Sequence, residues 1–222
     1  MCYNNIVMKG SDQTLKELIT MNSKLFENEI KEIQSEDYRD FIRFYFDDCV
    51  GNWFWKSGAS SSGKFHPKFS QGEGGLARHT KAVVMFCLEL LRLSSYAYMK
   101  DEFKDFAIMA CLLHDTCKYG MEDEVDKTCY KIHGELAAEK VSQAWFEFFG
   151  APAPELLCMA IRSHMGQWTE NKDHRPFTNI DRLVHLSDYI ASRSFIDIPQ
   201  ISEEYLADSC DILCANEDDL PF

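Results

Sequence analysis

The sequence lacks the features that mark an exported or membrane-embedded chain. No apolar run reaches the roughly 18 residues that a membrane-spanning helix needs, and the N-terminus has no basic-then-apolar signal pattern. No CxxC pair occurs among the nine cysteines, whose odd number is typical of a reducing compartment. These absences predict a cytoplasmic protein with no membrane partner.

Basic charge is also scarce. The formal net charge is −13, and eight acidic residues but no Lys or Arg follow Arg193, so residues 1–193 carry a net charge of −5. Broad, sequence-independent binding of nucleic acid is driven by basic surface, and this composition argues against it. If the protein is an enzyme that acts on phosphate compounds, the net negative charge of residues 1–193 favours a small substrate over a long nucleic acid.

The sequence does contain enough apolar residues for one sizeable core. The chain has 222 residues and 45% hydrophobic content, and no linker divides it convincingly. Apolar residues recur at three- and four-residue spacing, which predicts an all-α fold. We expect an N-terminal helical extension packed on the core over residues 1–57, the core over 58–200, and a flexible acidic tail over 201–222.

An aromatic-rich stretch lies within the predicted N-terminal extension. Residues 12–50 have the pattern of two or three amphipathic helices. The aromatic runs Phe44–Phe46 and Trp53–Trp55 could form a base-stacking surface, but a buried helical face explains them more simply. We therefore predict that these aromatic residues belong to the core.

A loop rich in small residues follows, from Gly58 to Gly75. Its start, Gly58–Lys64, matches the GxxxxGK phosphate-loop pattern, but Phe65 replaces the Ser or Thr that would bind magnesium, so we reject that motif. The loop is expected to be mobile. Two interpretations stay open, one with Lys64 and His66 near a substrate and the other a plain surface loop.

Five further helices are predicted, each with a histidine or aspartate on its inward face. Their expected ranges are 79–93, 101–118, 133–149, 154–164, and a helix through residue 191 that begins at a Thr178-x-x-Asp181 capping box. A single inward-facing histidine is usually a core residue whose ring is hydrogen-bonded. Five helices that each direct a histidine or aspartate inward favour one site to which all of them contribute. The inward-facing set consists of His79, His114, Asp115, His133, His164 and Asp188.

Imidazole nitrogen and carboxylate oxygen together are typical ligands of divalent metal ions. Asp188 lies on an apolar helix, where an unpaired carboxylate would be costly, so it needs a cationic partner. A second ion, about 3.5–4 Å from the first, would give the separation used by two-metal hydrolases. The residue types do not distinguish one ion from two, or Mn, Mg, Fe, Zn and Co from one another. We assign a first ion to His79, His114, Asp115 and Asp188, and a second to His133 and His164 with Asp115 bridging.

The catalytic roles are assigned to Asp115 and Lys118. Lys118 comes four residues after His114 and three after Asp115, so its ammonium could hold a phosphate oxygen beside the metal. The alternative is a solvated lysine in the last helical turn that complements the helix dipole. Weaker candidates for substrate contact are Arg78, Lys81 and Arg193.

Two other histidines are less constrained by the pattern. His185 comes three residues before Asp188 and is expected to hydrogen-bond a metal ligand, although direct ligation stays open. His174 lies in a polar stretch and is expected to be a solvent-exposed loop residue.

The order and spacing of these motifs resemble the HD superfamily of metal-dependent phosphohydrolases. The similarity covers about residues 58–195 and is nearest to the bacterial HD-type 3′-to-5′ exoribonucleases. It implies an all-α HD-domain helical bundle, a divalent-metal site, and hydrolysis of a phosphoester or phosphoanhydride bond in nucleotides or short oligonucleotide 3′ ends. The motifs that carry the resemblance are Gly74-Gly75-Leu76-Ala77-Arg78-His79, Leu113-His114-Asp115-x-x-Lys118, His133-Gly134-Glu135, Ser163-His164-Met165-Gly166 and His185-Leu186-Ser187-Asp188.

The sequence departs from the family pattern at two motifs. Thr116-Cys117 replaces the usual Ile-Gly after the HD pair, and Met165 replaces the second histidine of Ser-His-His-Gly. The second departure leaves the occupancy of the second metal position open. The N-terminal nucleic-acid-binding barrel of those exoribonucleases also has no counterpart.

The last residues resemble the acidic C-terminal tip of bacterial single-stranded-DNA-binding proteins. The resemblance implies a replication or repair protein as partner, whereas a merely solvating acidic tail is the other interpretation. If the tip were the main functional element, the chain would be a non-catalytic HD scaffold or interaction protein. The oligomeric state is left open. The residues expected to bind that partner are Asp218, Asp219, Leu220, Pro221 and Phe222.

Overall fold

The computed structural model describes residues 22–60, 66–121, 125–169, 171–198 and 201, and every regular element in those ranges is helical. This confirms the predicted all-α fold. Lys64, the predicted helix before residue 22 and the acidic tip lie outside the described residues. The α-helices are α2 (Glu27–Ile30), α3 (Glu36–Phe44), α4 (Trp53–Lys56), α5 (Gly75–Leu91), α6 (Asp101–Leu113), α7 (His133–Phe149), α8 (Glu155–Ser163) and α9 (Asn179–Ala191).

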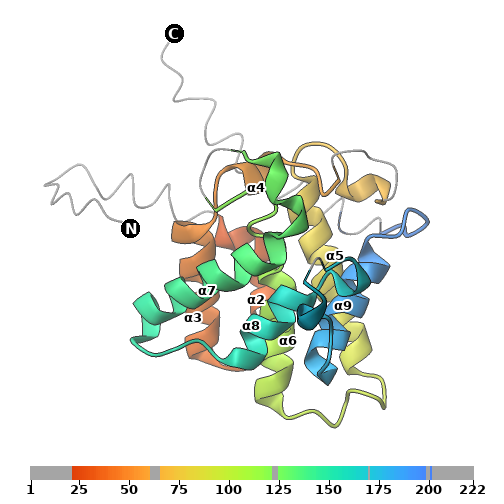
Figure 1. Cartoon of the computed structure of the whole chain (residues 1–222). Coiled ribbons are helices and arrows are strands. Elements are labelled where there is room, and N and C mark those ends of the chain that lie inside the picture. The colour runs from red at the N-terminus through yellow and green to blue at the C-terminus, as the bar shows by residue number, and fades with distance from the viewer. Residues whose placement is uncertain (1–21, 61–65, 122–124, 170, 199–200, 202–222) are drawn as a thin grey trace, which may run out of the picture.

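Helix α6 is the centre of the bundle. Figure 1 shows α6 and α8 in the middle, with α3 and α7 on one side and α5 and α9 on the other. Helix α6 packs against α5, α8 and α9, and every residue from Phe106 to Leu113 is buried. A helix that is apolar all round is stable only inside a core, so the HD pair at its end is carried into the middle of the protein.

The N-terminal helices share this core. The ring of Phe41 on α3 lies 4.9 Å from that of Trp145 on α7, and the rings of Phe26 and Phe46 stack at 4.7 Å. Tyr45, Phe46, Trp53 and Phe54 are buried, and the other two members of the aromatic runs, Phe44 and Trp55, are partly buried against the core. The prediction that these aromatic residues belong to the core, and not to a stacking surface, is confirmed.

A buried carboxylate also ties the N-terminal helices to α6. Asp105 of α6 accepts hydrogen bonds from the backbone N–H groups of Gln34 (2.8 Å) and Ser35 (3.0 Å), just before α3 begins. The hydroxyl of Ser35 in turn caps α3 by accepting from the N–H of Tyr38. The placement of α3 therefore depends on α6 as well as on apolar contact. The domain boundary at residue 57 stays a prediction.

Helix α6 ends at Leu113, five residues before the predicted end at Lys118. The hydroxyl of Thr116 donates to the Leu113 carbonyl (2.7 Å), and the N–H of Lys118 donates to the Asp115 carbonyl (3.1 Å). Both bonds span three residues, as in a tight turn, whereas the bonds of an α-helix span four. The prediction that His114 and Lys118 lie one α-helical turn apart is therefore wrong.

Other helix ends match the sequence more closely. Helix α7 has the predicted bounds, and Gly150, which follows it, has a φ of +66°, the left-handed conformation of a helix-ending glycine. Thr178 and Asp181 form the predicted capping box of α9. Helix α5, in contrast, begins at Gly75, four residues before the predicted start at His79.

Gly75 brings the loop before α5 into close contact with the helix. A Cβ at position 75 would overlap the backbone carbonyl oxygen of Ser70 and lie 2.6 Å from its carbonyl carbon. Neither atom can rotate away. Gly75→Ala should therefore lower the free energy of unfolding by about 1–3 kcal/mol and the melting temperature by roughly 2–4 °C per kcal/mol. Thermal denaturation followed by circular dichroism measures this, with the exposed Ser94→Ala as control; equal melting temperatures for both variants would contradict the close contact.

No described helix is both long enough and apolar enough to cross a membrane. None of the six cysteines within the described residues forms a disulfide bond, and four of the six are buried. Their burial explains their position in apolar helical stretches.

Candidate metal centre

All six residues predicted as metal ligands meet at one place. They come from five helices: α5 supplies a histidine, the end of α6 the HD pair, the start of α7 and the end of α8 a histidine each, and α9 an aspartate. Each histidine of the set is buried, whereas Asp188 keeps 19% of its side-chain exposure. The set consists of His79, His114, Asp115, His133, His164 and Asp188.

Three of the histidines have their tautomer set by a backbone carbonyl three residues earlier in the chain. The Nδ1 atoms of His114, His133 and His164 donate to the carbonyl oxygens three residues earlier, at 2.8, 2.6 and 2.8 Å. An imidazole that donates from Nδ1 leaves the lone pair of Nε2 free to bind a metal ion. All three Nε2 atoms approach the carboxylate of Asp115, so local helix-end geometry prepares the ligand atoms.

Four donor atoms surround the position predicted for the first ion. His79 Nε2 lies 3.0 Å from Asp188 Oδ1 and 3.8 Å from Asp115 Oδ2. His114 Nε2 lies 3.6 Å from Asp115 Oδ2 and 3.9 Å from Asp188 Oδ1. Ligand atoms held about 2.0–2.3 Å from one ion lie roughly 3–4 Å apart, as these do. His114 Nε2 is buried with no hydrogen-bond partner, which is the position of a metal ligand.

The other carboxylate oxygen of Asp115 faces the remaining two histidines. Asp115 Oδ1 is 2.9 Å from His133 Nε2 and 3.7 Å from His164 Nε2, and the two nitrogens are 2.9 Å apart. Two Nε2 lone pairs and a carboxylate oxygen this close repel one another unless a cation lies among them. Burial lowers the pKa of His164 to about 3, so its ring is not that cation near neutral pH. The residues present therefore fit a metal ion here as well.

The charge of Asp115 is stabilised by a lysine. Burial acts to raise the pKa of Asp115, but the nearby Lys118 and the surrounding histidines outweigh it and hold the pKa well below its usual range. Lys118 Nζ lies 2.6 Å from Asp115 Oδ2, and this contact raises the pKa of Lys118 against the opposite effect of burial. The pair is thus a carboxylate and an ammonium near neutral pH. The solvated, last-turn position considered for Lys118 is wrong.

The cluster forms part of the lining of a cavity of about 410 Å³. Of the residues predicted to contact substrate, His66, Lys118 and Arg193 line it. The guanidinium of Arg78 instead donates to the carbonyls of Phe69 and Gln71, so it holds the loop before α5. Lys81 is buried too, with its ammonium 3.9 Å from Glu29.

His185 lies where the sequence suggested, beside a predicted ligand. Its Nδ1 atom donates to the backbone carbonyl of His164 (2.7 Å), and its ring lies against Gly166. It therefore supports the chain at His164 and also lines the cavity. His174 is different from its prediction, because its ring contacts the carboxylate of Glu135 on α7 and is only partly exposed.

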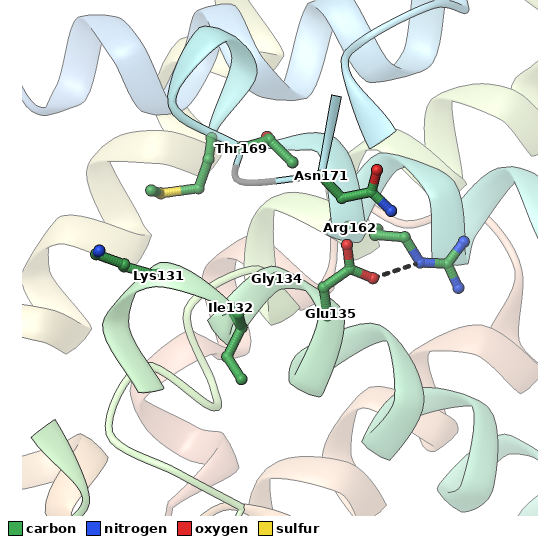
Figure 2. Close-up of a pocket in the computed structure, with 8 residues that line it drawn as sticks. Lys131, Ile132, Gly134, Glu135, Arg162, Thr169 and Asn171 are labelled. Carbon is green, nitrogen blue, oxygen red and sulfur yellow. Dashed lines mark ion pairs between the residues drawn. The ribbon is translucent and has the colours of Figure 1, made fainter. Parts of the chain in front are cut away.

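A smaller cavity of about 130 Å³ lies next to the larger one and shares Met165 with it. Figure 2 shows Glu135 and Arg162, two residues of its lining, joined by an ion pair in which Arg162 Nε lies 3.1 Å from Glu135 Oε2. Met165 thus occupies the wall between two cavities, at the position where the resemblance has a second histidine.

Four residues that line the larger cavity were not predicted as site residues: Met165, Trp168, Tyr189 and Ser192. Trp168 and Tyr189 line the larger cavity with exposed rings. Each is close in sequence to a predicted ligand, since Trp168 follows His164 by four residues and Tyr189 follows Asp188 directly. That proximity was the available signal, but helical periodicity alone does not show that their rings face the same space.

A helical bundle with a buried His/Asp cluster at the bottom of an open cavity defines a metal-binding class of α-helical proteins. The family model for the HD domain matches residues 76–193, more than half of the chain. The chain belongs to the HD-domain family, a superfamily of metal-dependent hydrolases. Comparisons with curated proteins and with solved structures gave no match.

Proposed function

We propose that this protein is a metal-dependent phosphohydrolase that cleaves a phosphoester or phosphoanhydride bond in nucleotides or short oligonucleotide 3′ ends. The observation that carries the proposal is the cluster of six candidate metal ligands, four of which line one cavity together with Lys118. The resemblance of the motif spacing to HD-type 3′-to-5′ exoribonucleases supports action on 3′ ends. The acidic charge of the chain supports a small or short substrate.

The proposed division of labour follows from the two oxygens of Asp115. Oδ2 faces His79 and His114, while Oδ1 faces His133 and His164, so the carboxylate can bridge two ions. A divalent ion bound there supplies Lewis-acid activation of water and of the phosphoryl group.

Lys118 provides the positive charge closest to this carboxylate. Its ammonium has three donors, and one is directed to Asp115 Oδ2 at 2.6 Å. The other donors are available to hold an oxygen of the phosphate as negative charge develops during displacement. In this role Lys118 both stabilises the ionised Asp115 and orients the substrate.

The proposed activity is tested by metal analysis of the purified protein and a screen for phosphate or nucleotide release in the presence of Mn²⁺. Mononucleotides, cyclic nucleotides and single-stranded oligonucleotides form the screen. We expect tightly bound divalent metal and turnover of at least one of these classes. A protein that binds no metal and releases no product from any class would exclude the proposed function.

Lys118→Met tests the phosphate contact separately from the metal site. Methionine keeps the apolar stem but removes the charge, so kcat/KM should fall by about 10²–10³-fold, as for loss of one donor that stabilises transition-state charge. Metal content should stay close to that of the unmodified protein. The control is Lys127→Met, because Lys127 is exposed and lies outside the cavity. Loss of metal in Lys118→Met, with proportionate loss of rate, would instead assign Lys118 to the stability of the metal site.

A further inference from the structure

Two exposed aromatic rings form part of the wall of the larger cavity. Trp168 ends the short helix η5 (Gly166–Trp168), and Tyr189 lies on α9. Their rings are nearly parallel, with an interplanar angle of 11° and a centroid separation of 5.9 Å. We refer to Trp168, Tyr189 and the neighbouring Arg193 as the aromatic wall.

Other described aromatic residues, such as Phe177 and Phe195, are exposed too, but of the exposed rings only those of Trp168 and Tyr189 line the cavity. Trp168 is 51% exposed and Tyr189 is 38% exposed, whereas Trp53 and Trp145 are buried in the core. The Tyr189 ring is stacked with Trp168 and has the Arg193 guanidinium over its face, so the half-exposed Trp168 ring is the surface left for a ligand to stack on.

Arg193 adds a positive, planar group to the aromatic wall. Its guanidinium carbon lies 4.2 Å from the centre of the Tyr189 ring, which is a cation–π contact. The side chain is held there by hydrogen bonds from Nε to the Tyr189 carbonyl (3.0 Å) and from a terminal nitrogen to Ser192 Oγ (2.7 Å). Ring faces beside an ordered guanidinium suit a flat, aromatic group attached to an anion.

The aromatic wall is tied closely to the metal cluster. Tyr189 follows Asp188 on α9, and Ser192 and Arg193, just beyond the end of that helix at Ala191, also line the cavity. On the other side, Gly166 has a φ of +60°, which turns the chain sharply between His164 and Trp168. The aromatic wall and the metal cluster therefore line one cavity, as the base and phosphate sites of one nucleotide would have to.

We propose that the aromatic wall stacks on the nucleobase of the substrate while the phosphate lies at the metal cluster. This inference rests on the proposed function, and it identifies the nucleobase as the part of the substrate by which the protein selects nucleotides. Stacking tolerates any base because every base has a π-face. The protein should therefore prefer nucleotides over base-free phosphoesters and discriminate only weakly among bases.

Binding to the metal-loaded protein tests this inference without relying on turnover. The probes are AMP and ribose 5-phosphate, which differ by the base, and calorimetry and tryptophan fluorescence report binding. AMP should bind at least about 10-fold more tightly than ribose 5-phosphate, and Trp168→Ala should remove most of that difference, as expected for loss of one base-stacking contact. Trp168→Phe should restore it in large part. The fluorescence change on AMP binding should disappear in Trp168→Ala.

The control variant is Phe177→Ala, since Phe177 is exposed and does not line the cavity. The inference is overturned if neither probe binds, if both bind equally, or if Trp168→Ala weakens both to the same extent. Base-dependent binding without hydrolysis of any substrate would retain the inference and reject the proposed function. Equal hydrolysis of nucleotides and base-free phosphoesters would do the reverse. If the dinucleotide pApA binds more tightly than AMP, the stacked base belongs to the end of an oligonucleotide. If AMP binds more tightly than pApA, the stacked base belongs to a free nucleotide.

Discussion

Asp115→Asn is expected to abolish most of the metal binding and to lower kcat/KM by about 10³-fold or more. The two oxygens of Asp115 face different histidine pairs, so one substitution affects both proposed metal positions. The amide keeps the shape of the side chain but loses its charge and presents an N–H donor to atoms that need an acceptor or a cation. A bound metal ion stabilises the transition state by several kcal/mol. Loss of that stabilisation corresponds to the expected fall in rate, because each 1.36 kcal/mol changes a rate about tenfold.

The measurement is the metal-to-protein ratio together with the rate of product release. Asp37→Asn serves as the control, because Asp37 is an exposed carboxylate on α3. Circular dichroism of both variants separates loss of the site from loss of the fold. Full metal content and an unchanged rate in Asp115→Asn would show that the cluster is structural, and the enzymatic interpretation would then be abandoned.

Phe41→Ala is expected to lower the free energy of unfolding by about 3–5 kcal/mol, as for other buried phenylalanines replaced by alanine. Phe41 is fully inaccessible to solvent, and its ring packs against Trp145 (4.9 Å) and Phe149 (5.8 Å) of α7. Truncation leaves a cavity between α3 and α7 that the surrounding aromatic rings are too rigid to fill. The melting temperature should fall by roughly 2–4 °C for each kcal/mol lost.

Chemical denaturation followed by tryptophan fluorescence and by circular dichroism measures this effect. The matched control is Phe177→Ala, whose ring is 77% exposed, and which should change stability by less than about 0.5 kcal/mol. A single shifted transition in Phe41→Ala would place the N-terminal helices in one cooperative unit with α7. An unchanged main transition would show that α3 unfolds separately from the rest of the bundle.

Much of the candidate metal site could be predicted because its chemistry is carried by residue type. Histidine and aspartate on inward helical faces need a partner, so His79, His133 and Asp188 were identifiable before their distances were known. The capping box at Thr178 was identifiable for a similar reason, since it depends on residues three positions apart. Local signals of this kind survive in the sequence without any knowledge of packing.

Other features depend on how distant segments meet. Arg78 was a candidate for substrate contact, but the carbonyls of Phe69 and Gln71 bind its guanidinium because the preceding loop folds back on α5. His174 was expected to be exposed, but the chain after α8 brings it to Glu135 on α7. No periodic pattern encodes such contacts, because the partners lie in irregular segments or on different helices.

The sequence by itself determined the all-α class, the six inward-facing candidate metal ligands and the presence of a lysine near the HD pair, since these follow from helical periodicity and the cost of burying polar groups. The tertiary structure alone decided how the two oxygens of Asp115 are shared, which basic residues face the cavity, and that Trp168 and Tyr189 lie together on its wall. Distances between side chains on different helices are set by how the helices pack around α6. The spacing of residues along one chain does not contain that information.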